Sequence, residues 1–343
     1  MATDSPSDAG GPSPVAQAGR PLLSVRDLVT VFPARDRIVC AVNGVSFDLH
    51  EGETLGLVGE SGSGKSVTCR SLLRLVPEPG EIIGGSIEFD GQDILALPPS
   101  ALRALRGAQI AMIFQDPMTS LNPVFTVGSQ IVEPLRQHRG MSSREAHREA
   151  VDLLDRVGIA SPSERLRAYP HEFSGGMRQR AMIAVAISCK PKLLLADEPT
   201  TALDVTIQDQ ILSLLLELQA EERMAIVLVS HDLGVIAQTC DRVAVMYAGY
   251  VVEEAATTDL FATPKHPYTA ALLDALPELA QQRGDRRLVA IKGQPPDLGD
   301  LPSGCPFAPR CAHVRPACSE VSMELMPAGD RHSTACPFSE VLG

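Results

Sequence analysis

The sequence has no tryptophan and few other aromatic residues, since nine Phe and four Tyr amount to 4% of its 343 residues. Burial of apolar surface must therefore rest on Leu, Ile, Val, Met and Ala. Hydrophobic residues still make up 44% of the chain and charged residues 21%, which is typical of a chain that buries a core. At this length we expect more than one ordinary domain and fewer than three.

The sequence also lacks an excess of positive charge. It has 30 Lys and Arg residues and 42 Asp and Glu residues, which gives a net charge of -12. An acidic surface repels phosphate backbones, which argues against a nucleic-acid partner. No uncharged apolar run approaches the ~20 residues that span a bilayer. The N-terminus lacks the basic and apolar regions of a signal peptide. We therefore expect a cytosolic chain that does not itself span a membrane.

Short apolar runs alternate with amphipathic helical patterns along most of the chain. Residues 1–20 are rich in Ser, Pro, Gly and Ala and predict a disordered tail. The apolar runs are Leu55–Val58, Leu193–Ala196 and Ala225–Val229. Such runs are typical of buried parallel strands, although short core helices can share the pattern. The alternation predicts an α/β fold with a largely parallel sheet.

Two segments depart from this alternation. Residues 116–189 are mostly helical, include a capping box at Ser142 and Glu145, and predict an inserted helical subdomain. From residue 261 to 343, Pro, Gly and Cys dominate and regular periodicity fades. We therefore predict a main domain at 21–260 and a small Cys-rich C-terminal extension at 261–343.

A phosphate loop is the strongest motif. Residues Gly59–Ser66 match the pattern GxxxxGK[ST] in full, between a predicted strand and a predicted helix. The glycines allow backbone N–H groups to surround a phosphate, Lys65 is expected to reach the β- and γ-phosphates, and Ser66 to bind Mg²⁺. The predicted nucleotide contacts are Gly59, Ser61, Gly62, Ser63, Gly64, Lys65, Ser66 and Thr68.

Two carboxylates, Asp197 and Glu198, follow the predicted strand Leu193–Ala196. In a nucleotide hydrolase, Asp197 can hold the Mg²⁺ shell. Glu198 can accept a hydrogen bond from the attacking water and act as general base. Taken alone, such a pair is more often a solvated strand end, but beside a phosphate loop it favours catalysis.

Between about residues 23 and 254 the sequence resembles the ATP-binding-cassette (ABC) ATPases. Residues 173–177 (Phe-Ser-Gly-Gly-Met) resemble the signature motif of that family, where the general pattern has Leu and Gln at the two ends. The resemblance implies that Ser174, Gly175 and Gly176 face the γ-phosphate of ATP bound by a second subunit. It also implies an ABC-type P-loop domain with a RecA-like core plus a helical subdomain.

Four further positions take roles from this resemblance. Gln115 matches the Q-loop residue, which contacts Mg²⁺ and the attacking water. His231 matches the switch histidine, which contacts the γ-phosphate and orients the water. Residues 202–204 (Ala-Leu-Asp) match the D-loop, so that Asp204 is expected at the dimer interface. Phe32 is expected to stack on adenine, with a core or hairpin role as the alternative.

Three strings in the C-terminal extension resemble the dipeptide and oligopeptide importer ATPases. They are residues 266–269 (His-Pro-Tyr-Thr), 291–296 (Ile-Lys-Gly-Gln-Pro-Pro) and 304–311 (Gly-Cys-Pro-Phe-Ala-Pro-Arg-Cys). The resemblance implies an ATP-hydrolysing subunit of an ABC importer for di- or oligopeptides, although relatives also handle nickel complexes and glutathione.

The same resemblance implies partners and a location. The expected partners are a second ABC ATPase subunit that is related but not identical, two transmembrane permease subunits and an extracytoplasmic substrate-binding protein. The expected location is peripheral, on the cytoplasmic face of the inner membrane. Residues 118–123 (Met-Thr-Ser-Leu-Asn-Pro) are expected to contact the permease.

Four of the eight cysteines cluster near the C-terminus, namely Cys305, Cys311, Cys318 and Cys336. Disulfides are rare in the cytosol, so the cluster favours metal binding. Four thiolates suit zinc or an iron–sulfur cluster, and the spacing leaves both open. The resemblance to the importer subfamily implies a [4Fe–4S] cluster, with zinc as the alternative and His313 and His332 as substitute ligands.

Two rival functions fit the sequence less well. A soluble ABC ATPase that acts on nucleic acid would need a basic surface or a coiled-coil insertion, and the sequence has neither. A nucleotide-gated scaffold without hydrolysis would be expected to lack Glu198 or His231, and both are present.

Overall fold

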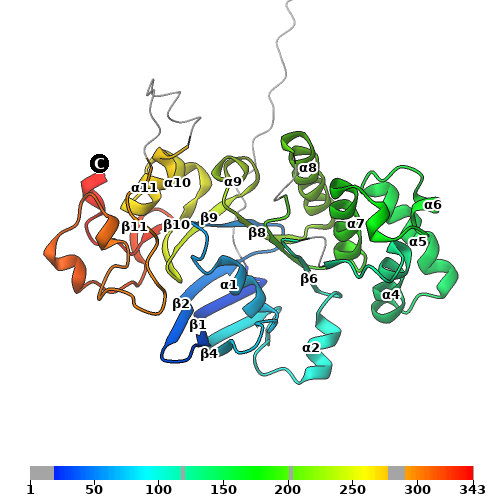
Figure 1. Cartoon of the computed structure of the whole chain (residues 1–343), viewed down its shortest axis with the longest axis horizontal. Coiled ribbons are helices and arrows are strands. Elements are labelled where there is room, and N and C mark those ends of the chain that lie inside the picture. The colour runs from blue at the N-terminus through cyan, green and yellow to red at the C-terminus, as the bar shows by residue number, and fades with distance from the viewer. Residues whose placement is uncertain (1–18, 117–119, 201–203, 277–289, 343) are drawn as a thin grey trace, which may run out of the picture.

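The structure, a computed structural model, describes residues 19–116, 120–200, 204–276 and 290–342. All but the last two residues of the predicted tail therefore lie outside the described part. Within that part the chain forms a large mixed sheet, a smaller antiparallel sheet and surrounding helices (Figure 1). No helix in the described ranges is both long and apolar enough to cross a membrane.

The large sheet carries the site. Its strand order is β11 (Met326–Gly329), β12 (His332–Thr334), β10 (Tyr250–Ala256), β9 (Arg242–Tyr247), β3 (Thr54–Val58), β8 (Ala225–Ser230), β7 (Leu193–Asp197) and β6 (Ile110–Ile113). The strands from β9 to β6 run parallel, whereas β10, β12 and β11 pair antiparallel.

The apolar runs form the central strands of this sheet. Every residue of β3, β7, β8 and β9 is buried, because helices or the second sheet cover both faces. The predicted α/β fold with a largely parallel sheet is confirmed. The second sheet has the order β2 (Ile38–Leu49), β1 (Leu23–Pro33), β4 (Glu81–Phe89) and β5 (Gln92–Asp93).

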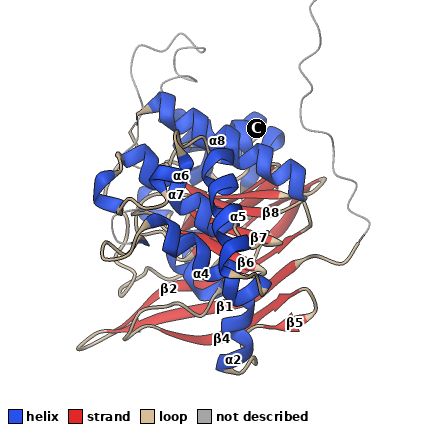
Figure 2. Cartoon of the chain, turned by 90° about the vertical axis from the view of Figure 1, so that its right-hand side faces the viewer, coloured by secondary structure: helices blue, strands red, loops and turns tan. Residues whose placement is uncertain are grey.

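Helices fill the connections between strands (Figure 2). They are α1 (Lys65–Leu72), α2 (Pro99–Leu105), α4 (Val127–Arg139), α5 (Ser143–Arg156), α6 (Pro162–Arg165), α7 (Gly175–Ile187), α8 (Val205–Glu222), α9 (Leu233–Thr239), α10 (Thr257–Ala262) and α11 (Pro267–Asp274). Short 3-10 helices are η1 (Pro170–Glu172), η2 (Ala308–Arg310), η3 (Pro316–Ser319) and η4 (Ser339–Leu342).

Helices α4 to α7 form a group between β6 and β7, on one side of the molecule in Figure 1. The predicted capping box is present at the start of α5, where Ser142 and Glu145 exchange hydrogen bonds with each other's backbone N–H. Ala146, Ala150 and Leu154 then point the apolar face of α5 into the core. The predicted capping box is therefore confirmed.

The C-terminal region lies at the opposite side of the molecule and shares the core of the main domain (Figure 1). Strand β12 pairs with β10, with Thr334 opposite Glu253, and so extends the large sheet. Phe307 is 2% exposed and packs against Tyr247 and Tyr268, with ring centroids 5.3 Å away in both cases. The region therefore takes much of its burial from the main domain.

Candidate active site

The phosphate loop connects β3 to α1, and two of its glycines have no room for a side chain. Gly59 has a φ of 149°, and a Cβ there would lie 2.1 Å from the carbonyl oxygen of Met246. Gly64 has a φ of 104°, and its Cβ would lie 2.3 Å from the carbonyl oxygen of Ala41. The loop therefore runs close against the backbone of its neighbours, which only glycine permits.

The ammonium group of Lys65 is turned into this loop. Its Nζ donates to the carbonyl oxygens of Gly59 at 2.8 Å and Glu60 at 2.9 Å, and to Oγ of Ser63 at 3.3 Å. The side chain is buried, and this burial lowers the pKa of Lys65 against the attraction of nearby carboxylates. The cation is therefore held at the place where a phosphate anion would bind.

Two oxygen ligands suited to Mg²⁺ lie together at the end of β7. Oγ of Ser66 donates to Oδ1 of Asp197 at 2.7 Å. Asp197 is fully buried, and its Oδ2 has no hydrogen-bond partner among the described residues. Burial raises the pKa of Asp197, as expected for a carboxylate that lacks a cation. Carboxylate and hydroxyl oxygens are ligands that Mg²⁺ prefers, so the donor set fits this ion.

Two of the three predicted catalytic side chains, Gln115 and His231, approach one carboxylate oxygen of the third, Glu198. Nε2 of Gln115 donates to Oε2 of Glu198 at 3.1 Å. Nδ1 of His231 lies 3.3 Å from the same oxygen. The three residues follow β6, β7 and β8, which are neighbours in the sheet. Because parallel strands end at one edge, positions far apart in sequence meet there. Glu198 itself has a φ of 48°, in the left-handed region.

The signature residues lie apart from this chain's own phosphate loop. Ser174 is the N-cap of α7, and its Oγ accepts a hydrogen bond from the N–H of Met177 at 3.3 Å. Ser174 and Gly175 are exposed. In Figure 1, α7 belongs to the helical group, away from α1. The exposed helix N-terminus is therefore open to an anion from outside the chain.

Other predicted contacts have local structural partners. Asp204 is exposed and caps α8, accepting a hydrogen bond from the N–H of Ile207 at 3.0 Å, whereas Ala202 and Leu203 lie outside the described residues. Oγ1 of the buried Thr68 donates to the carbonyl oxygen of Gly64 at 3.0 Å, so this hydroxyl supports the loop from behind.

Phe32 lies near the end of β1 and is half-buried. A Cβ on Gly80 would lie 2.5 Å from its ring, so the edge of the ring rests on the backbone of Gly80. Its stacking on adenine stays a prediction.

The prediction of a [4Fe–4S] cluster, with zinc as its alternative, is wrong. Among the described residues, which include all four C-terminal cysteines, no three His, Cys, Asp or Glu side chains are placed to hold a metal ion. Sγ of Cys311 and Sγ of Cys318 instead accept backbone hydrogen bonds, at 3.3 and 3.4 Å. Burial raises the pKa of Cys305 to about 11, which keeps this thiol protonated at neutral pH.

The two histidines proposed as substitute metal ligands, His332 and His313, also have other roles or positions in the structure. Nε2 of His332 lies 2.7 Å from Oε1 of the fully buried Glu253, which ties β12 to β10. His313 is exposed. The stabilisation expected from a metal is therefore supplied by sheet pairing, this buried pair and the packing of Phe307. Composition alone did not reveal these contacts, because they lie between the extension and the main domain.

One contact at the site is not predicted by the sequence. Arg310 forms an ion pair with Glu60, the second residue of the phosphate loop. Both residues stand inside strings that the sequence singles out, but 250 positions separate them. Nothing in either string indicates that they meet.

Two family models match the chain. The model described as "ABC transporter" matches residues 42–201, and the model described as "Oligopeptide/dipeptide transporter, C-terminal region" matches residues 252–318. The oligopeptide transport ATP-binding protein OppD of Salmonella typhimurium is 50% identical over 327 residues, which cover 95% of this chain and 97% of that protein. The dipeptide transport ATP-binding protein DppD of Haemophilus influenzae is 49% identical over 310 residues, covering 90% and 93%.

Among solved structures, the dimeric post-hydrolysis structure of the ATP-binding cassette MJ0796 with ADP and Pi is similar, with a TM-score of 0.63 and 28% identity. The match covers 68% of this chain and 98% of that one. With the geometry described above, these likenesses show the family. The chain belongs to the ABC transporter family, in its oligopeptide/dipeptide branch, as an ATP-hydrolysing subunit.

Proposed function

We propose that this chain hydrolyses ATP to drive the uptake of di- or oligopeptides through a membrane-bound importer. The observation that carries the hydrolytic part is the approach of Gln115 and His231 to one oxygen of Glu198, beside the phosphate loop. The peptide part rests on relatives at 49–50% identity that are named for oligopeptide and dipeptide transport. The proposed division is a cassette at 21–260, with its helical subdomain at about 116–189, and a C-terminal extension at 261–343.

Glu198 is proposed as the general base. The γ-phosphoryl group would lie on Lys65 and the loop N–H groups. A water molecule would attack its phosphorus, give its proton to the Glu198 carboxylate, and break the bond to the ADP oxygen. Gln115 and His231 contact Oε2 of Glu198, so they fix the orientation of this carboxylate. His231 would also contact the γ-phosphate.

Mg²⁺ would be held by Ser66, Asp197 and Gln115. The ion supplies neutralisation of charge on the β- and γ-phosphate oxygens. The unpartnered, buried Oδ2 of Asp197 supports this assignment, because a buried carboxylate oxygen without a donor is costly unless a cation binds it.

A complete site requires a second cassette. The exposed Ser174 and Gly175 and the half-buried Gly176 would bind the γ-phosphate of ATP held by the partner, and Asp204 would lie at the interface between the two. The partner is proposed to be a related, non-identical subunit. Two such cassettes would close around ATP and reopen after hydrolysis.

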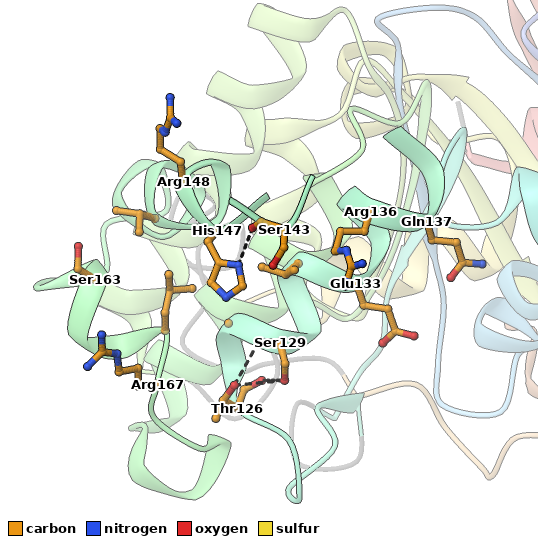
Figure 3. A pocket seen from close by; sticks show the side chains of 14 residues that line it. Thr126, Ser129, Glu133, Arg136, Gln137, Ser143, His147, Arg148, Ser163 and Arg167 are labelled. Atoms are coloured by element: carbon orange, nitrogen blue, oxygen red, sulfur yellow. Dashed lines mark hydrogen bonds between the residues drawn. The ribbon is translucent and has the colours of Figure 1, made fainter. Parts of the chain in front are cut away.

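The helical subdomain offers a surface for the permease. A groove of about 1060 Å³ lies between α4, α5 and α6 (Figure 3). Beside it, the loop after Gln115 exposes Val124 by 70% and Phe125 by 54%. Residues 118 and 119 of the predicted permease contact lie outside the described part. We assign permease docking to this loop and groove, and so the location to the cytoplasmic face of the inner membrane.

The composite site can be tested with the purified chain alone and with its permeases and partner cassette. The chain alone should be a weak ATPase, and turnover should rise when the complex is assembled. Ser174→Arg should leave ATP binding to this chain intact but reduce turnover of the complex about a hundredfold. Ser100→Arg, at an exposed position of α2 outside the groove and the ATP site, is a matched control and should keep the turnover of the complex. Full activity from a strictly monomeric sample, established by light scattering during turnover, would disprove the composite site.

The substrate is tested by uptake. Cells that lack the chain should lose uptake of a labelled dipeptide or oligopeptide and regain it with the wild-type gene but not with Lys65→Ala. Loss of nickel-complex or glutathione uptake with normal peptide uptake would contradict the peptide assignment.

A further inference from the structure

Glu60 in the phosphate loop is held by two side chains from the C-terminal region. Nη1 and Nη2 of Arg310 donate to its two carboxylate oxygens, at 2.5 and 3.0 Å. The hydroxyl oxygen of Tyr268 accepts a hydrogen bond from the N–H of Glu60 at 2.8 Å. The carbonyl oxygen of Glu60 accepts one from Lys65 at 2.9 Å. One loop residue is therefore fixed at its side chain and at both of its backbone groups.

The guanidinium of Arg310 is oriented by groups other than Glu60. Its Nε donates to the carbonyl oxygen of Lys292 at 3.0 Å, and its Nη1 to the hydroxyl of Tyr247 at 3.3 Å. Its Cζ lies over the rings of Tyr247 and Phe307, 5.8 and 6.0 Å from their centroids. The side chain is only 5% exposed. A buried guanidinium fixed in this way presents two parallel donors in a set direction.

Both contacts to Glu60 come from one packed unit. The ring of Tyr268 lies 4.5 Å from that of Tyr247 and 5.3 Å from that of Phe307, centroid to centroid. Tyr268 is fully buried, and Phe307 precedes the short helix that carries Arg310. Because these rings pack together, Tyr268 and Arg310 cannot shift independently of each other.

The ion pair also changes the charge that an incoming phosphate meets. Glu60 lies one position after Gly59, and its charge acts on Lys65 within the same loop. Without Arg310, the Glu60 carboxylate would stand unpaired in a loop that binds a polyanion, and like charges repel. With Arg310 in place, this charge is paired with a guanidinium.

We propose that Arg310 and Tyr268 are positioning residues through which the C-terminal region sets the affinity of the phosphate loop for ATP. Arg310 neutralises and orients Glu60, and Tyr268 fixes the peptide N–H at the start of the loop. Neither residue touches the reacting atoms. The inference rests on the proposed binding of the ATP phosphates to Gly59–Ser66.

The test measures the dissociation constant for Mg·ATP by titration calorimetry on the full chain. Arg310→Ala should raise this constant about tenfold, which is a typical size for coupling between neighbouring sites. Adding Glu60→Gln to Arg310→Ala should restore most of the affinity, because the repelling charge is then gone. Tyr268→Phe keeps the packed ring and removes only the hydroxyl, so it should weaken binding less than Arg310→Ala and without loss of thermal stability.

Two controls separate this proposal from its alternatives. Arg315→Ala removes an exposed ion pair to Glu340 within the same C-terminal region, and should leave ATP affinity unchanged. Lys65→Ala tests the phosphate site itself: if it binds ATP normally, the proposed function fails. If Lys65→Ala loses binding while Arg310→Ala and Tyr268→Phe bind as wild type, the positioning role is overturned. A loss in Arg310→Ala that Glu60→Gln does not reverse would indicate general loosening and would also overturn it.

Discussion

The Ser66 hydroxyl donates a 2.7 Å hydrogen bond to Oδ1 of Asp197, which joins the phosphate loop to the end of β7. The first residue after Asp197 is Glu198, whose Oε2 meets Gln115 and His231. The anion-binding loop and the proposed base are therefore linked through two adjacent residues of one strand end. The binding of a nucleotide and the orientation of Glu198 share the same short piece of backbone.

Glu198→Gln removes the proposed proton acceptor and keeps the shape of the side chain. ATP binding should survive, whereas ATPase turnover of the assembled transporter should fall by about a hundredfold or more. Glu222→Gln is a control. Glu222 is the last residue of α8 and forms ion pairs with Arg156 and Lys190, so this variant should keep its turnover. Wild-type turnover in Glu198→Gln would rule out the assignment of the base.

Gly59→Ala and Gly62→Ala place the same methyl group at two positions in one loop. At Gly59 the methyl would lie 2.1 Å from the Met246 carbonyl oxygen, so the loop must move and ATP binding should be lost. At Gly62, where φ is 79°, no neighbouring atom of the described residues lies within 4 Å of the new methyl, so the cost is limited to about 1–2 kcal/mol of backbone strain. Titration with ATP measures both, and equal losses would contradict this difference.

His266 makes stability depend on pH. It is 1% exposed, its backbone N–H donates to Glu253, its ring Nδ1 accepts from the N–H of Tyr268, and burial lowers its pKa to about 4. In the unfolded chain this histidine has a pKa of about 6.5. Between pH 6.5 and pH 4 the unfolded chain therefore binds more protons than the folded chain. Stability therefore falls as the pH falls through this window, by about 2 kcal/mol between pH 7 and 5.

His266→Asn is the matched variant, because asparagine can also cap α11 and does not titrate. Denaturant unfolding at pH 7 and pH 5 should show a smaller loss of stability in this variant than in the wild type. Parallel pH curves for the two proteins would contradict the assignment of this titration to His266.

The sequence predicted those parts of the site that depend on a local pattern. The phosphate loop requires glycines at fixed intervals, which the sequence shows directly. The strands that lead to Asp197 and to His231 are apolar runs, which also predict strands. Their meeting at one sheet edge followed from the parallel topology alone. The capping box at Ser142 and Glu145 is equally local, and it is present.

The failures concern contacts between distant segments. Four cysteines in a Pro- and Gly-rich stretch suggested a metal, because the stretch itself has little to bury. In the structure, Phe307 packs against Tyr247 of the main domain and Tyr268 of the extension, so part of the core of the extension comes from the main domain. The pairing of Arg310 with Glu60 was missed for the same reason, because the sequence does not show which oppositely charged residue lies next to a given charge.

The helical insertion leaves the sheet after β6 and returns to it at β7, and these two strands are adjacent. The two chain connections of the helical group therefore lie side by side at one edge of the sheet, and its helices pack in the same core as the sheet. Gln115 lies just beyond the first connection, whereas Glu198 follows the strand at the second. A rotation of the helical group about these connections would change the 3.1 Å separation of these side chains. A load applied to the helices from outside would thus reach the alignment of the proposed base.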